Sequence, residues 1–222
     1  MPAIRYLHKT IFFIVGLVFS FRVSAHIIVD ELATMSKSEA ATAYLIAGFE
    51  HILPMGLDHI LFIVGLFLFN PKLKSILIQS TVFTVAHSVT LILSSYEIIA
   101  PPETIVEPLI ALSIAYIAIE NIFLQDLKPT RIVVVFLFGL LHGMGFAGAL
   151  SEVGLPENAY LLSLISFNIG VELGQVTVIL LAHLLIAKWF SKKEWYRSKI
   201  VIPISIVIAI IALYWSIERM IL

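Results

Sequence analysis

Long apolar runs alternate with short polar connections along the chain. Apolar residues dominate the segments 40–69, 75–94, 104–124, 131–150, 158–187 and 200–217. A helix needs about 20 such residues to cross a bilayer. The runs are separated where helices should end or begin, at Asn70-Pro71, Pro101-Pro102, Pro129 and Pro156. The pattern predicts an all-α membrane protein, with a bundle of about six transmembrane helices in a single domain over residues 40–222.

The first run is longer than one straight span requires. About 30 helical residues extend roughly 45 Å, whereas the hydrocarbon core is about 30 Å thick. Pro54 and Gly56 lie in the middle of this run, and proline removes a backbone donor that a helix needs. We therefore expect a kink or a break near Pro54-Gly56. Broken membrane helices often surround binding sites.

Residues 1–25 have the pattern of a cleavable signal peptide. Two basic residues, Arg5 and Lys9, precede an apolar core from Ile11 to Phe21, and Val23-Ser24-Ala25 resembles a cleavage site. The alternative is an uncleaved first helix, for which this core is short. Cleavage would leave residues 26–39 as a short extracytoplasmic segment. Its first residue, His26, could bind a metal outside the membrane through its α-amine and imidazole.

Basic residues lie in alternate connections between the runs. These connections contain Lys72, Lys74, Lys128, Arg131, Lys188, Lys192, Lys193, Arg197 and Lys199. The other connections carry acidic residues, namely Glu97, Glu103, Glu152 and Glu157. Because basic loops remain in the cytoplasm, the pattern predicts insertion in a bacterial inner membrane, with the mature N-terminus and the C-terminus both outside.

Composition supports a membrane protein and limits its chemistry. Hydrophobic residues make up 60% of the 222 residues and charged residues 13%, with a mean hydropathy of +1.03; soluble domains have about 45–50% and 25%. A net charge of −1 argues against nucleic acid as a partner. The chain has no cysteine, so a metal would be bound by nitrogen and oxygen atoms.

Ionisable and amide side chains recur inside the apolar runs, where they are costly and usually mark ion or substrate pathways. The candidate metal ligands lie in the outer half of the membrane or near its midplane, and they are His51, Asp58, His59, His87, His142 and Glu172. The polar residues expected to support them are Ser88, Asn168 and Gln175. Glu120 and Asn121, nearer the cytoplasm, form a candidate exit path. The last run has no such polar stripe and is expected to be scaffold.

This donor set is typical of a site for a divalent transition metal. Two or three histidines with one or two carboxylates suit Ni²⁺, Co²⁺, Zn²⁺ or Fe²⁺, and the ligand types do not separate these ions. Asp58 could bind the metal directly, or it could accept the ring N–H of a ligating histidine and fix its tautomer. The competing interpretation is a buried Asp–His pair that only holds helices together.

Four motifs together resemble the HupE/UreJ family of hydrogenase and urease accessory membrane proteins, in the branch that has a signal peptide. Between residues 40 and 187, the motifs run from Gly48 to His59, from Phe83 to Ser88, from Gly139 to Gly143 and from Phe167 to Gln175. The resemblance implies uptake of nickel, or of cobalt in some members, for metalloenzyme assembly. The family's first-span motif maps onto His51, Asp58 and His59. In nickel permeases of the family a proline directly follows the histidine, whereas here Pro54 is three residues after His51.

Three functions are compatible with these features. The first is a nickel/cobalt-type permease that binds the ion at the histidines and releases it past Glu120 and Asn121 to a metalloenzyme maturation system. The second is an intramembrane hydrolase, in which histidines hold Zn²⁺ and Glu172 or Asp58 is the general base. The third is a membrane assembly factor without transport. A polar path from the histidines to Glu120 would favour the permease, and an apolar seal would favour the enzyme.

Overall fold

The computed structural model describes residues 35–124 and 128–221, and all regular secondary structure in these two ranges is helical. Side chains are not described for 147–149 and 151–153. The predicted signal peptide and the candidate ligand His26 lie outside the described residues, so both stay predictions.

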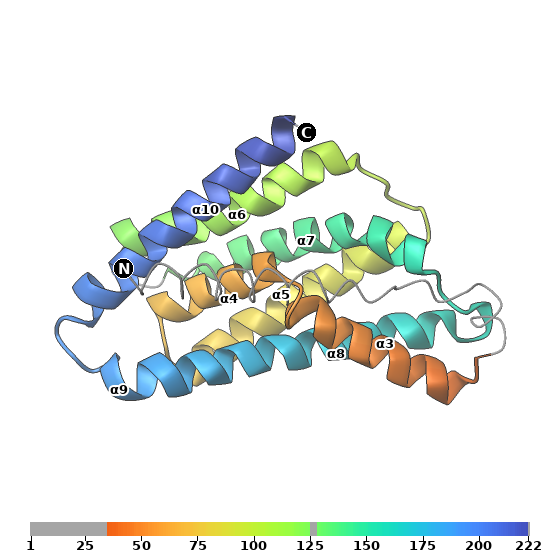
Figure 1. Cartoon of the computed structure of the whole chain (residues 1–222), viewed down its shortest axis with the longest axis horizontal. Helices are drawn as coiled ribbons and strands as arrows, with labels where there is room; N and C mark the ends of the chain where they lie inside the picture. The colour runs from red at the N-terminus through yellow and green to blue at the C-terminus, as the bar shows by residue number, and fades with distance from the viewer. Residues whose placement is uncertain (1–34, 125–127, 222) are drawn as a thin grey trace, which may run out of the picture.

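The helices run back and forth along an elongated bundle (Figure 1). The long helices are α3 (Lys37–Ile52), α4 (Leu57–Phe69), α5 (Leu73–Ser95), α6 (Glu103–Phe123), α7 (Arg131–Val153), α8 (Tyr160–Ala182) and α10 (Ile202–Ile221). The 3-10 turn η1 (Glu157–Ala159) precedes α8, and the π-helical turn η2 (His183–Ala187) and α9 (Lys188–Phe190) extend it. A second π-helical turn, η3 (Arg197–Val201), leads into α10. We call the end with the connections after α5 and α7 the acidic end, and the end with the connections after α4, α6 and α9 the basic end.

Four helical segments are each long and apolar enough to cross a membrane: Leu73–Ser95, Glu103–Phe123, Glu157–Phe190 and Arg197–Ile221. The pair α3 and α4 meets the same criterion as one bent unit. The described apolar stretch of α7, Arg131–Phe146, is shorter. The described residues therefore support four or five spans rather than the expected six, and a sixth span through α7 stays a prediction. Many large apolar side chains, such as Leu185 and Ile210, are exposed on the bundle surface, as contact with lipid requires.

The first span is broken where the sequence predicts it. The axes of α3 and α4 differ by 65°, and Pro54 has no N–H to continue the helix. The Gly56 N–H donates to the Ile52 carbonyl at 3.2 Å. A Cβ atom on Gly56 would overlap the carbonyl oxygen of His51, so only glycine allows the chain to turn this closely. The break places the last turn of α3 beside the first turn of α4.

Three helix pairs make the most extensive contacts: α3 with α8, α5 with α7, and α6 with α10. The first two pairs are parallel, and α6 and α10 are antiparallel. Glycines allow the backbones of α3 and α8 to approach closely. A Cβ atom on Gly48 would overlap the Phe167 carbonyl oxygen, and one on Gly170 would overlap the Leu45 carbonyl oxygen. On α7, a Cβ atom on Gly143 would likewise overlap the His87 carbonyl of α5. Close packing of these pairs fixes the relative positions of the polar side chains on the same helices.

Gly48→Ala should destabilise the protein by about 3 kcal/mol, because the added methyl group meets backbone atoms of α8 that cannot move aside without separating the two helices. Gly65→Ala on α4 is the matched control. Its Cβ would meet only the Ile117 side chain, at 3.0 Å, and alanine is the better helix former by about 1 kcal/mol. Thermal unfolding of both variants in detergent micelles tests the difference. Equal stability of the two variants would contradict the proposed α3–α8 contact.

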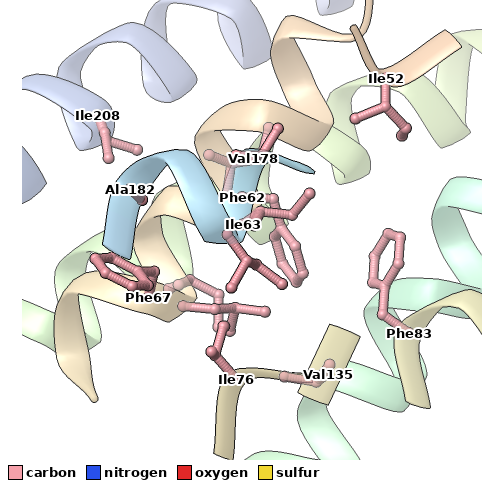
Figure 2. Packing of buried hydrophobic residues seen from close by; sticks show 14 of the residues in the cluster. Ile52, Phe62, Ile63, Phe67, Ile76, Phe83, Val135, Val178, Ala182 and Ile208 are labelled. Carbon is pink, nitrogen blue, oxygen red and sulfur yellow. The ribbon is translucent and has the colours of Figure 1, made fainter. Parts of the chain in front are cut away.

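The apolar core is centred on α4 (Figure 2). This helix has 13 residues, of which seven are buried. Phe62, Ile63 and Phe67 pack in one cluster with Ile76 of α5 and with residues of the neighbouring helices. These four side chains are each at most 2% exposed. α4 therefore fills the half of the bundle toward the basic end, and the same cluster continues toward the acidic end through Tyr44, Leu91 and Leu164.

Candidate metal centre

Four histidines from four helices gather where the first span breaks. His51 is in the last turn of α3, His59 is in the first turn of α4, His87 is on α5 and His142 is on α7. The ring centroid of His59 lies 4.7 Å from that of His51, 5.1 Å from that of His142 and 5.9 Å from that of His87. We call these four residues the histidine centre.

The spacing of the ring nitrogens suits a metal ion. Candidate ligand atoms of His51, His59 and His87 all lie within 4.8 Å of one another, and among the described residues this is the one group of three or more metal-binding side chains. Histidine nitrogens bind zinc at about 2.0–2.1 Å, so ligands around one ion are roughly 3–4 Å apart. Small side-chain movements would close the remaining gap. His142, beside His59, can supply a fourth nitrogen.

Five of the eight ring nitrogens of the histidine centre are buried without a hydrogen-bond partner. The Nε2 atoms of His51, His59 and His142, and both ring nitrogens of His87, are buried and unpaired. Each such group costs about 1–3 kcal/mol when left unsatisfied. The Nδ1 atom of His142 is 2.8 Å from the Phe138 carbonyl, so Nδ1–H donates there and the Nε2 lone pair is free. Free imidazole lone pairs that face one another are the donor set a divalent transition metal would satisfy.

A cavity of about 220 Å³ adjoins the histidine centre. Its lining includes His51, Asp58, His59 and His142, with Glu107 and Arg219 among the other lining residues. Glu107 lies in the first turns of α6, and Arg219 lies in the last turn of α10, so the cavity lies toward the acidic end. The histidine centre is accessible from this end of the bundle.

Charged side chains lie in the outer part of this cavity. Arg219 Nη2 donates to Asp58 Oδ2 at 2.8 Å, and Arg219 Nε is 3.9 Å from Glu107 Oε2. The three side chains are partly exposed, at 23%, 26% and 50% for Arg219, Asp58 and Glu107. Asp58 therefore lies beside the histidine centre but is paired with Arg219. The sequence did not indicate Arg219, since a cation after the last apolar run also occurs as an ordinary membrane anchor.

Phenylalanines close the histidine centre on the side of the basic end. Phe62, Phe83 and Phe138 each lie about one helical turn from a histidine of the same helix, on its basic-end side. Phe62 and Phe83 have ring centroids 4.9 Å apart, and that of Phe83 is also 4.9 Å from His142. The Phe62 and Phe138 rings are 6.2 Å apart. We call these three residues the aromatic layer.

The candidate exit residues lie beyond the aromatic layer in a buried network around Arg131. This guanidinium is 1% exposed and forms an ion pair with Glu120. Its Nε donates to Gln79 at 3.2 Å, and Nη2 donates to Asn121 at 3.4 Å. Asn121 also donates to the Gly65 carbonyl at 2.7 Å. Both residues are held by structural partners, so their role in metal exit stays a prediction. The sequence placed Arg131 in a cytoplasmic connection and gave no sign of its burial.

The remaining predicted residues lie between α5 and α8, and of these Asn168 lies beside His87 of the histidine centre. Glu172 is hydrogen-bonded to Thr81 and Thr84, and Gln175 accepts a hydrogen bond from Ser80. Ser88 donates to the Thr84 carbonyl, and Asn168 donates to the Leu164 carbonyl. The structure therefore does not bring Glu172 together with the three grouped histidines. The sequence did not indicate Ser80, Thr81 and Thr84 as partners, because hydroxyl residues are common in membrane helices.

Comparison with known proteins agrees with the motifs. Residues 25–219 match the family described as HupE / UreJ protein. The match covers most of the chain and all four helices of the histidine centre. No curated protein and no solved structure matches the chain. The chain therefore belongs to the HupE/UreJ family.

Proposed function

We propose that this chain is a permease that takes up a divalent transition metal of the nickel or cobalt type through the histidine centre. The observation that carries this proposal is the set of five buried, unpaired imidazole nitrogens beside a cavity toward the acidic end. Membership of the HupE/UreJ family, whose proteins are accessory membrane proteins linked to metal handling, supports it. A metalloenzyme maturation system would be the recipient.

The residues suggest how an ion would enter. Asp58 and Glu107 place two carboxylates against one guanidinium in the outer cavity, so its net charge favours a cation. Neutral imidazoles then replace water around the ion, because only their unprotonated nitrogens bind metals. The aromatic layer and the Arg131 network would have to separate before the ion could leave at the basic end. The described arrangement thus corresponds to a permease that is open at one end and closed at the other.

Asp58→Asn should lower the initial rate of metal uptake into proteoliposomes by at least tenfold, because the cavity loses the carboxylate nearest the histidines. Radiolabelled Ni²⁺, Co²⁺ and Zn²⁺ would be compared, and the preferred ion would identify the cargo. Glu103→Gln, an exposed acid at the same end, is the matched control and should transport normally. Metal bound by the wild-type protein without any uptake would rule out the permease.

The aromatic layer favours a second candidate, an intramembrane metal-dependent hydrolase. Phe62, Phe83 and Phe138 separate the histidines from Glu120, as a site with one entrance would require. Three histidines would hold Zn²⁺ with one position open for water, and Asp58 would be the general base beside it. This candidate predicts that the Asp58→Asn variant still binds the metal but no longer hydrolyses lipid-soluble esters or amides. Neither the wild type nor this variant would then take up metal into proteoliposomes.

The uptake direction also requires the acidic end to face outside the cell. The alternation of basic and acidic connections predicts this orientation. Single cysteines placed at Glu103 and Lys192 of this cysteine-free chain would report it through a membrane-impermeant thiol reagent applied to intact spheroplasts. Labelling at position 103 alone is the expected result, and labelling at position 192 alone would reverse the proposed direction.

A further inference from the structure

A groove whose accessible surface is almost wholly apolar lies on the outside of the bundle between α5 and α8, away from the metal cavity. Its volume is about 300 Å³, and its lining includes Thr81, Thr84, Ser88, Asn168 and Glu172. Val85, Ile165 and Ile169 complete its sides and are 54%, 47% and 49% exposed. A groove flanked by exposed apolar side chains on a membrane-spanning bundle faces lipid.

Glu172 lies near the middle of the bilayer in this groove. It is the thirteenth of the 23 residues of α8, so it lies roughly 15–18 Å from each end of this helix at 1.5 Å per residue. It is partly exposed. No lysine, arginine, histidine or second acid is among the residues that line the groove, and none of the ion pairs in the described part of the chain involves Glu172. An unpaired carboxylate exposed to hydrocarbon is strongly disfavoured, and such a group normally becomes neutral instead.

The hydroxyl partners of Glu172 accommodate the same state. Thr81 Oγ1 donates to Glu172 Oε1 at 2.8 Å. Thr84 Oγ1 lies 2.5 Å from Glu172 Oε2 and 3.2 Å from the Ser80 carbonyl, but a threonine hydroxyl has one hydrogen to donate. If Glu172 is a carboxylate, Thr84 can make only one of these two hydrogen bonds. If Glu172 is protonated, its O–H donates to Thr84 Oγ1 while Thr84 donates to the Ser80 carbonyl, so both contacts are hydrogen bonds at once.

We propose that Glu172 is a proton-binding site of the membrane domain, held as a neutral acid in the lipid-facing groove between α5 and α8. This site is separate from the histidine centre, since both carboxyl oxygens contact threonines. Thr84 precedes His87 by three residues on α5, so the proton site and the metal site lie about one helical turn apart along that helix. If the chain is a permease, as proposed above, a proton leaving Glu172 can compensate one of the two positive charges of an entering divalent cation.

Carbodiimide labelling tests the proton site without any metal. The O–H of a protonated carboxyl group adds across one C=N bond, so that its oxygen bonds to carbon and its proton goes to nitrogen. The acyl group then moves to nitrogen, which gives a stable N-acylurea with no leaving group and no change of oxidation state. Purified full-length protein in detergent micelles at pH 7 would be treated with dicyclohexylcarbodiimide or with a water-soluble carbodiimide, and the modified residues would be identified by mass spectrometry of peptides.

The expected result is labelling of Glu172 by the apolar reagent, at least tenfold more than by the water-soluble one. Glu120, which is paired with Arg131, is the internal control and should stay unlabelled. In the infrared spectrum, the carbonyl band of a protonated acid should be present in the wild type and in Glu120→Gln and absent in Glu172→Gln. An unlabelled Glu172, equal labelling by the two reagents, or an infrared band that persists in Glu172→Gln would each overturn the proposal.

Uptake measurements then separate this proposal from the function on which its role depends. Glu172→Gln should bind as much metal per chain as the wild type but transport it at least tenfold more slowly. Wild-type protein without uptake would refute the permease and leave the labelling result intact. Normal uptake by Glu172→Gln would refute the coupling role of this proton.

Discussion

His87→Ala should weaken metal binding by more than about 100-fold, because it removes a side chain that binds the metal directly. Removal of a residue that only orients such a ligand already lowers metal affinity by about 10–100-fold. Both ring nitrogens of His87 are buried without a hydrogen bond of ordinary geometry, so the lone pair of this imidazole is available to a metal. Metal content after equilibrium dialysis against Ni²⁺, Co²⁺ or Zn²⁺ measures the effect. The wild type should hold about one ion per chain, and His87→Ala should hold almost none at the same free concentration.

His183→Ala is the matched control for this substitution. His183 begins η2 beyond α8, toward the basic end, and it does not belong to the group of histidines around the break. Its replacement should leave metal content unchanged. A folded His87→Ala protein that retains the wild-type amount of metal would rule out the histidine centre as the binding site.

Arg131→Ala should destabilise the protein by about 3–5 kcal/mol, the usual cost of removing one partner from a buried ion pair. Glu120 would lose its charged partner, and Gln79 and Asn121 would each lose a donor. The contact of the guanidinium with the Phe69 ring, at 4.5 Å, would also be lost. Thermal unfolding in detergent micelles, followed by circular dichroism, measures the change.

Two further variants separate the ion pair from a general effect of charge. Lys128→Ala removes an exposed cation from the same connection and should change stability by less than about 0.5 kcal/mol. Arg131→Met combined with Glu120→Leu removes both charges, and it should recover most of the lost stability, because paired apolar residues often replace a buried ion pair without cost. A double variant as unstable as Arg131→Ala would show that the hydrogen bonds to Gln79 and Asn121 matter more than the pair.

The helix limits and the break follow from local features of the sequence. Apolar runs and proline positions place the helix ends within a few residues of those observed, because a membrane span depends on the composition of a short segment. The break follows from Pro54 and Gly56, whose backbone effects are also local. The meeting of His51 with His59 was predictable for the same reason, since both flank the break.

Features that depend on which helices pack together were not predictable. The contact of α5 with α7 brings His87 near His142, and no periodicity within one helix indicates that pairing. Glu172 has the spacing of a polar stripe on α8, but its partners Thr81 and Thr84 turn it toward lipid rather than toward the histidines. Arg131 and Arg219 both lie at the edges of apolar runs, where surface and buried cations look alike in sequence.

The break between α3 and α4 also affects the electric field at the histidine centre. Its two half-helices meet there with opposite ends, the carbonyl end of α3 beside His51 and the amide end of α4 beside Asp58 and His59. These ends carry roughly half a negative and half a positive elementary charge, so their effects on an ion between them largely cancel. A divalent cation at this point therefore gains little from the backbone. Its charge must therefore be compensated by side chains, of which Asp58 is the nearest carboxylate. Asp58 is paired with Arg219, so the metal would have to replace Arg219 as its partner, and the free energy of this replacement would set how strongly the ion is held.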